Sequence, residues 1–159
     1  MAIKNIVVSV AGGGLSLLTA KYAIYLAKIV GAKLTAIYVV DEKSLGDLLK
    51  SRVFVEVEAH SYKRELEDQG RSFLDRLKKA AENKGVQCDG ALLEGVVHVQ
   101  VLNKTKEVNA DLLVMGELKD VLSRKELFYD EGERIFRESP CPVVVVKNSE
   151  EVERLYKEI

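Results

Sequence analysis

The chain has little of what marks several large classes of protein. Its 159 residues include only two cysteines, Cys88 and Cys141, too few for the disulfide framework of a small secreted domain, and we expect both to be buried structural thiols. No apolar run approaches the roughly 18 residues of a membrane-spanning helix. The start "MAIKNIVVSV" has no signal-peptide pattern. We therefore expect a cytoplasmic protein that makes no use of a membrane.

An excess of one charge is also lacking. The 24 basic and 25 acidic side chains leave a net charge of −1, which argues against a broad nucleic-acid surface. The histidines, His60 and His98, lack cysteines or carboxylates at metal-site spacing, apart from a weak match between Glu56 and His60. For neither histidine is there an evident nucleophile that it could activate as a general base. We expect neither a metal centre nor an enzyme.

What the chain does have is an alternation of buried-strand and helix patterns. Apolar runs rich in β-branched residues predict strands, and stripes at helical spacing predict the helices between them. The predicted strands cover 5–11, 33–41, 86–95, 110–116 and 139–148, and the helices cover 16–30, 62–84, 97–109 and a short segment after Asp130. This order predicts an α/β fold with an open five-stranded parallel sheet sandwiched by helices, in one domain over 1–159.

Local signals suggest where several helices begin and end. Ser16 is a candidate N-cap for the first helix, and Gly31 and Gly85 follow helical stripes as terminators. Asp130 and Glu133 form a D-x-x-E capping box ahead of a short helix. We expect helices to start after Ser16 and after Asp130.

Two segments have weaker patterns. In 41–62, the alternation of Val53, Val55 and Val57 with charged residues fits an edge strand, whereas the flanking charges equally suit the start of a long helix. The C-terminal extension 149–159 is expected to form an exposed helical turn or two. Both interpretations of 41–62 stay open at this point.

In an open parallel sheet, ligands bind beyond the carboxyl ends of the strands, at the point where the strand order reverses. The stretch "AGGGLS" follows the first predicted strand there, but a dinucleotide fingerprint needs a third glycine where this chain has Leu17. A tight strand-to-helix turn is the simpler interpretation, and a role near a ligand is the other.

The order of segments resembles the universal stress protein family. "NIVVSV", "AKYAIYLAKIVGAKLTAIYVVD", "ADLLVMG" and "SPCPVVVV" carry the likeness over nearly the whole chain. It implies a Rossmann-like fold of the adenine nucleotide alpha hydrolase kind, a role in stress response, and a homodimer, commonly formed through the last strand, here Val143–Lys147. A strongly apolar edge strand favours the same dimer, because it needs a partner. Many members of the family bind ATP, and others do not.

The nucleotide-binding motif of the family is degenerate in this chain. ATP-binding members carry an Asp after the first strand and a G-x-x-G, nine residues, G-S or G-T pattern after the fourth. Here Ala11 takes the Asp position, Gly116 matches the first glycine, and Lys119, Tyr129 and Asp130 replace the rest in register. We expect the Asp130 carboxylate to cap the following helix, whose positive end favours an anion by ~0.3–1 kcal/mol, and so to fill the phosphate site.

The resemblance therefore implies a vestigial pocket. Its residues are Val10, Ala11, Val40, Met115, Gly116, Lys119 and Asp130. Phe128 and Tyr129 either plug it, present an interaction surface, or simply pack the loop onto the sheet. The leading hypothesis is a binding or regulatory module without ATP, with an unknown protein partner. The alternative is an adenine-nucleotide sensor or weak ATPase that uses the residual adenine slot.

Overall fold

The computed structural model describes residues 2–11, 14–41, 46, 50, 56–116 and 126–159, without the side chains of 14–15, 56 and 126–130. Ten elements follow one another in these residues. They are β1 (Asn5–Val10), α1 (Gly14–Val30), β2 (Lys33–Asp41), α3 (Glu56–Asn83), β3 (Cys88–Gly95), α4 (Val97–Glu107), β4 (Leu112–Gly116), α5 (Glu126–Glu138), β5 (Val143–Val146) and α6 (Ser149–Lys157).

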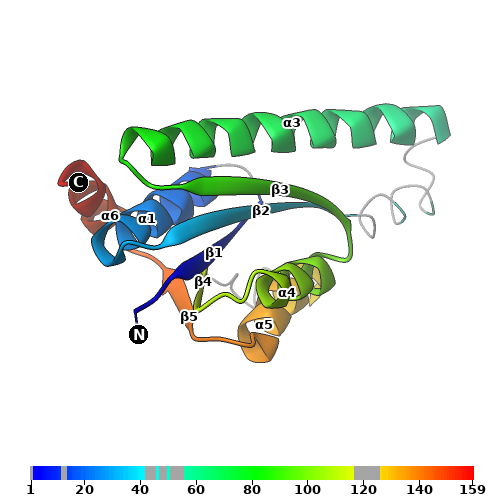
Figure 1. The fold of residues 1–159 in the computed structure, drawn as a ribbon. Coiled ribbons are helices and arrows are strands. Elements are labelled where there is room, and N and C mark those ends of the chain that lie inside the picture. Colours follow the sequence, from blue (N-terminus) through cyan, green and yellow to red (C-terminus); the bar gives the residue numbers. More distant parts are fainter. Residues whose placement is uncertain (1, 12–13, 42–45, 47–49, 51–55, 117–125) are drawn as a thin grey trace.

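The five strands form one parallel sheet in the order β3-β2-β1-β4-β5. Figure 1 shows α1, α3 and α6 on one face of this sheet and α4 and α5 on the other. The predicted fold, an open five-stranded parallel sheet sandwiched by helices, is confirmed. The central strand β1 pairs with β2 on one side and β4 on the other, so the two halves of the sheet meet there.

Two apolar layers hold the helices onto the sheet. The first layer, on the side of α1, α3 and α6, includes Ile6, Val8, Ile24, Leu34 and Leu77. The second layer, on the side of α4 and α5, includes Val7, Ile37, Val101, Leu113 and Ile135. Successive residues of β1 enter opposite layers, which explains why the buried strands read as continuous apolar runs.

The helix ends are partly as predicted. Gly31 and Gly85 follow α1 and α3 with φ of 73° and 78°, so their role as terminators is confirmed. The two predicted N-caps are wrong. α1 begins at Gly14 and α5 at Glu126, so Ser16 and Asp130 both lie inside helices. For α5 the reason is that the upstream Glu and Leu are good helix formers, and D-x-x-E also fits a helix interior.

The uncertain segment 41–62 is helical from Glu56 onward, where α3 begins. Val57 lies on this helix with 75% of its surface exposed, while Val53 and Val55 lie outside the described residues. Figure 1 shows that the first turns of α3 extend past the carboxyl end of β3. The helix interpretation is therefore confirmed for the described part of the segment.

The prediction of an exposed helical turn or two for the C-terminal extension is wrong, because the extension forms a docked helix, α6. Val152 of α6 is 2% exposed and joins the first layer, with Tyr156 and Ile159 packed against it. The Lys21 ammonium of α1 lies 2.7 Å from the Glu153 carboxylate. The prediction failed because the spacing of these three apolar residues makes a stripe whose partner surface is visible only in the fold.

Within the part of the chain that the structure describes, no helix combines the length and apolar character needed to cross a bilayer.

Candidate functional site

The strand order reverses between β1 and β4, and their carboxyl ends form the place where ligands bind in open parallel sheets. Val8 pairs with Val114, so continuing the register puts Val10 level with Gly116. Ala11 follows directly and is exposed. Residues 12–13 of the "AGGGLS" stretch and residues 117–125 lie outside the described residues.

The start of α1 packs tightly over this edge through two hydroxyl side chains. The Ala11 N–H donates a hydrogen bond to the Ser16 Oγ at 2.9 Å. A Cβ atom added at Gly116 would lie 3.0 Å from the Thr19 Oγ1, closer than most real contacts. Ser16 and Thr19 are both buried. Gly116 is thus explained by close packing of α1 on β4, whether or not a ligand binds.

The predicted apolar adenine slot is not a single open surface. Val10, Val40 and Met115 are all at most 5% exposed. Val10 belongs to the first layer, and Val40 projects to the same face, since it alternates in phase with Tyr38 of that layer. Met115 belongs to the second layer, on the opposite face of the sheet. The structure therefore brings Val10 and Val40 to one face but not Met115.

The phosphate end of the predicted pocket has a different geometry from the one expected. Lys119 lies outside the described residues, as do the side chains of Phe128, Tyr129 and Asp130. In a helix that begins at Glu126, the Asp130 N–H donates to the carbonyl of Glu126, four residues earlier. Asp130 therefore does not act as the N-cap that fills an anion site, and its own N–H is occupied within the helix.

α5 contacts the start of α4 through a pair of residues that the sequence pattern does not predict. The His98 N–H donates to the Glu131 Oε2 at 2.6 Å, and the His98 Nδ1 lies 2.9 Å from the same oxygen. The N-cap residue Val96 makes no side-chain hydrogen bond, so Glu131 supplies the acceptor from another helix. Because the two residues are 33 positions apart, no local pattern signals the pair.

The cysteines do not form a reactive site. Burial, together with the nearby Asp89 carboxylate, raises the pKa of Cys88 to about 11. Burial also raises the pKa of Cys141, although the Ser139 hydroxyl beside it acts in the opposite direction. Cys88 is a buried thiol as predicted, whereas Cys141 is half-buried. Among the described residues, no three His, Cys, Asp or Glu side chains come together as metal ligands.

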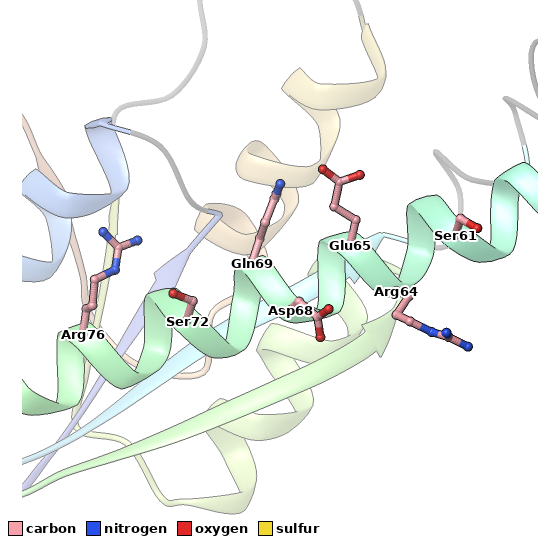
Figure 2. A pocket seen from close by; sticks show the side chains of 7 residues that line it. All are labelled: Ser61, Arg64, Glu65, Asp68, Gln69, Ser72 and Arg76. Carbon is pink, nitrogen blue, oxygen red and sulfur yellow. The ribbon is translucent and has the colours of Figure 1, made fainter.

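A recess of about 570 Å³ follows one side of α3 (Figure 2). In Figure 2, Glu65 and Gln69 project to the same side of the helix, whereas Arg64 points away from them. Asp68 already pairs with Arg71 at 3.1 Å. The described lining residues, all from α3, are Ser61, Arg64, Glu65, Asp68, Gln69, Ser72 and Arg76. Their opposite charges offset one another, and we interpret the recess as a solvated helix face.

Comparison with known proteins agrees with the fold and with the order of segments. Residues 2–147 match the model of the universal stress protein family. A universal stress protein of Methanocaldococcus jannaschii is 33% identical over 144 residues, which cover 91% of this chain and 82% of that protein. A second relative, YxiE of Bacillus subtilis, is 27% identical over 91% of this chain and 99% of its own length.

Solved structures share the same architecture. A family protein from Burkholderia pseudomallei superposes with a TM-score of 0.69 at 24% identity, over 92% of this chain and 97% of that one. A universal stress protein in complex with cAMP has a TM-score of 0.63 at 21% identity, over 92% and 98%. These likenesses show the fold, and the family match shows the relationship. The chain belongs to the universal stress protein family.

Proposed function

We propose that this chain is a non-catalytic binding or regulatory protein of stress adaptation in the cytoplasm, and that it does not hold ATP in the family's phosphate loop. The observation that supports this proposal is that α5 begins at Glu126. Residues 129 and 130, which stand at the family's phosphate-binding positions, lie inside α5, and the Asp130 N–H donates to the Glu126 carbonyl instead of remaining free for phosphate. At the other side of the crevice, Ala11 offers no carboxylate, and its N–H is bonded to Ser16.

A melting scan with millimolar ATP and Mg²⁺ tests this proposal. A ligand at 100 times its Kd stabilises by ~2.7 kcal/mol, and each kcal/mol is about 2–4 °C for a domain of this size. We expect no shift, and no excess absorbance at 260 nm in the purified protein. An upward shift of about 5 °C or more, or co-purified adenine nucleotide, would overturn the proposal.

The quadruple variant Ala11→Asp, Lys119→Gly, Tyr129→Gly, Asp130→Ser is the matched positive control. It restores the family pattern, and the new Gly and Ser favour a helix that starts later and leaves its N–H groups open. We expect this variant to gain an ATP-dependent shift. If it folds but gains none, the four substitutions are not what closes the site.

A second candidate is an adenine-nucleotide sensor or weak ATPase. Two observations favour it: Val10 and Val40 share one face at adjacent strand ends, and a protein of the same fold is known in complex with cAMP. Lys119 would contact the phosphates. Scans with cAMP, AMP and ATP separate the candidates, because a shift with cAMP or AMP but not ATP favours a sensor. Phosphate release from ATP would favour the ATPase.

We also propose that the protein is a homodimer formed through β5. This strand is four valines at an edge of the sheet, and Val143, Val144 and Val145 are only partly buried. The Leu113 N–H donates to the Pro142 carbonyl, so by the parallel pattern the Val144 N–H faces β4 and the Val145 N–H faces outward. An apolar edge with unpaired backbone groups is stabilised by pairing with a second copy.

A further inference from the structure

A second recess, of about 490 Å³, lies at the end of the sheet opposite the family's ligand crevice. It is formed by the amino ends of β1, β2 and β3, with side chains from the later turns of α3 and α4. Its polar lining residues are Asn5, Lys33, Thr35, Lys78, Asp89 and Lys104. Ligand sites of 300–1,000 Å³ are typical for small molecules, so the volume suits a metabolite.

The recess carries an excess of positive charge, because three lysines face one carboxylate. The Lys33 Nζ lies 2.8 Å from the Asp89 Oδ2. The hydrogen bond from Lys33, followed by the positive charges of Lys33, Lys78 and Lys104, lowers the pKa of Asp89. The positive charges of all three ammonium groups therefore add up at the Asp89 carboxylate. Lys104 also lies 3.4 Å from Glu107, a carboxylate exposed to solvent outside the recess.

Thr35 adds an observation that is independent of charge. It is 7% exposed, and its neighbours Leu34 and Ala36 both belong to the first layer, so its side chain projects to the opposite face. The hydroxyl has no hydrogen-bond partner within the described residues, although Thr35 lines the recess. Buried hydroxyl groups in native proteins almost always have a partner, so one supplied by a ligand or by water is required.

We propose that this recess binds a small phosphorylated metabolite, with its phosphate between Lys78 and Lys104 and hydrogen-bonded to the Thr35 hydroxyl. Lysine binds phosphate as a mobile point charge and needs no planar, bidentate geometry. Lys33 is held by Asp89 at 2.8 Å, whereas Lys104 has only a longer contact, 3.4 Å, with the exposed Glu107, so Lys78 and Lys104 are the ammonium groups that meet the anion. The site lies at the other end of the strands from the nucleotide crevice and does not depend on whether that crevice is occupied.

Amide NMR titrations with inorganic phosphate, glycerol 3-phosphate and glycerol test the site. We expect shifts at Asn5, Thr35 and Asp89 with both phosphates and none with glycerol. Tighter binding of the ester than of inorganic phosphate identifies the ligand as a phosphorylated metabolite. Binding of inorganic phosphate alone, or no shifts at these residues, would overturn the proposal.

A matched pair of variants tests whether these lysines are responsible. Lys78→Gln with Lys104→Gln removes two charges from the recess and keeps the pair between Lys33 and Asp89. Lys79→Gln with Lys106→Gln removes two charges from exposed positions beside them on the same helices. We expect the first variant to bind glycerol 3-phosphate at least tenfold more weakly and the second to bind within twofold of the unchanged protein. Equal losses would mean general charge attraction and would refute the site.

Thr35→Val provides a separate measurement, because valine keeps the shape of threonine and removes the hydroxyl. We expect binding to weaken severalfold while the melting temperature stays the same or rises, since no protein partner loses a hydrogen bond. Unchanged binding in this variant would contradict the role of Thr35, even if the lysine variants behave as expected.

Discussion

Asp111 shows how a single side chain fixes the start of two neighbouring strands. Its Oδ2 accepts the N–H groups of Lys4 at 2.8 Å and Asn5 at 2.9 Å, and its own N–H donates to the Asn5 carbonyl at 2.8 Å. These hydrogen bonds connect the chain at the start of β1 to the chain just before β4. The hydrogen bonds from the backbone of Asn5 and Lys4 lower the pKa of the Asp111 carboxyl.

The first prediction concerns the pH dependence of Asp111→Ala. A carboxyl whose pKa is lowered by folding adds stability above its unfolded pKa, about 4, and this stability is lost as the pH falls through the folded value. We expect the variant to be clearly less stable at pH 7 and the difference to shrink below pH 4. Urea unfolding at several pH values measures it. Asp75→Ala, at an exposed position of α3, is the control and should change little. A difference independent of pH would contradict the prediction.

At the scale of elements, α6 stabilises the first layer from the end of the chain. Val152 is buried between α6 and α1, and the Nζ of Lys84, which follows the end of α3, lies 4.7 Å from the centre of the Tyr156 ring. The same ammonium donates to the Ile159 carbonyl at 2.8 Å. α6 therefore packs on α1 and also contacts Lys84, in the turn that follows α3.

The second prediction is that Val152→Ala lowers the free energy of unfolding by about 2 kcal/mol, from two lost methyl groups plus a small cavity. Val57→Ala is the matched control, because Val57 is 75% exposed, and its change should stay within about 0.5 kcal/mol. Chemical denaturation measures both. Equal effects would show that α6 does not dock as described.

The third prediction concerns the approach of α3 to the sheet at Gly70. A Cβ atom there would meet Leu92 Cδ1 at 2.7 Å and the Tyr38 ring at 2.8 Å. Alanine would gain ~1 kcal/mol of helix propensity, but overpacking against a buried ring costs ~1–3 kcal/mol. We expect Gly70→Ala to lower the melting temperature by a few degrees, as differential scanning calorimetry would show. Gly46→Ala, with open space around it, is the control, and stabilisation by Gly70→Ala would contradict the close approach.

How far each element could be predicted depends on whether its signal lies in neighbouring residues or in contacts formed only in the folded protein. Strands and the terminators Gly31 and Gly85 are local: apolar runs and positive φ are properties of a few residues. The start of α1 and the docking of α6 are not. They depend on contacts such as the hydrogen bond between Ala11 and Ser16 and the packing of Val152 in the first layer. Local signals predicted caps because capping residues also occur inside helices.

The candidate site divides in the same way. The position of the crevice follows from the alternation of strands and helices, and the structure places the carboxyl ends of β1 and β4 there. The face of the sheet on which each side chain lies does not follow from this alternation, since Val10 and Met115 enter opposite layers. The contact between α4 and α5 joins His98 to Glu131, residues 33 positions apart, and only the packed fold reveals it.

At the scale of the whole molecule, the two edges of the sheet differ. β3 lies at one edge, beneath α3, and β5 at the other. Figure 1 shows β5 at the side of the sheet away from α3. The apolar edge at β5 is the surface that the proposed homodimer would cover.

The fourth prediction is that Val145→Pro converts the proposed dimer to a monomer. Proline removes the outward N–H of Val145 and leaves the Val144 N–H that faces β4. Light scattering should give twice the chain mass of 17.7 kDa for the unchanged protein and the single mass for the variant. Circular dichroism confirms that the variant folds, and a folded variant that remains dimeric would place the interface elsewhere.

The order of the strands also has a consequence for how the protein is made. β1, β2 and β3 are neighbours both in the chain and in the sheet, whereas β4 must pair with β1 across a separation that reaches 107 residues at Lys4 and Asp111. Pairing over so long a separation is slow, because loop closure costs entropy. We therefore expect β1, the central strand of the finished protein, to present an open edge during synthesis until β4 emerges from the ribosome.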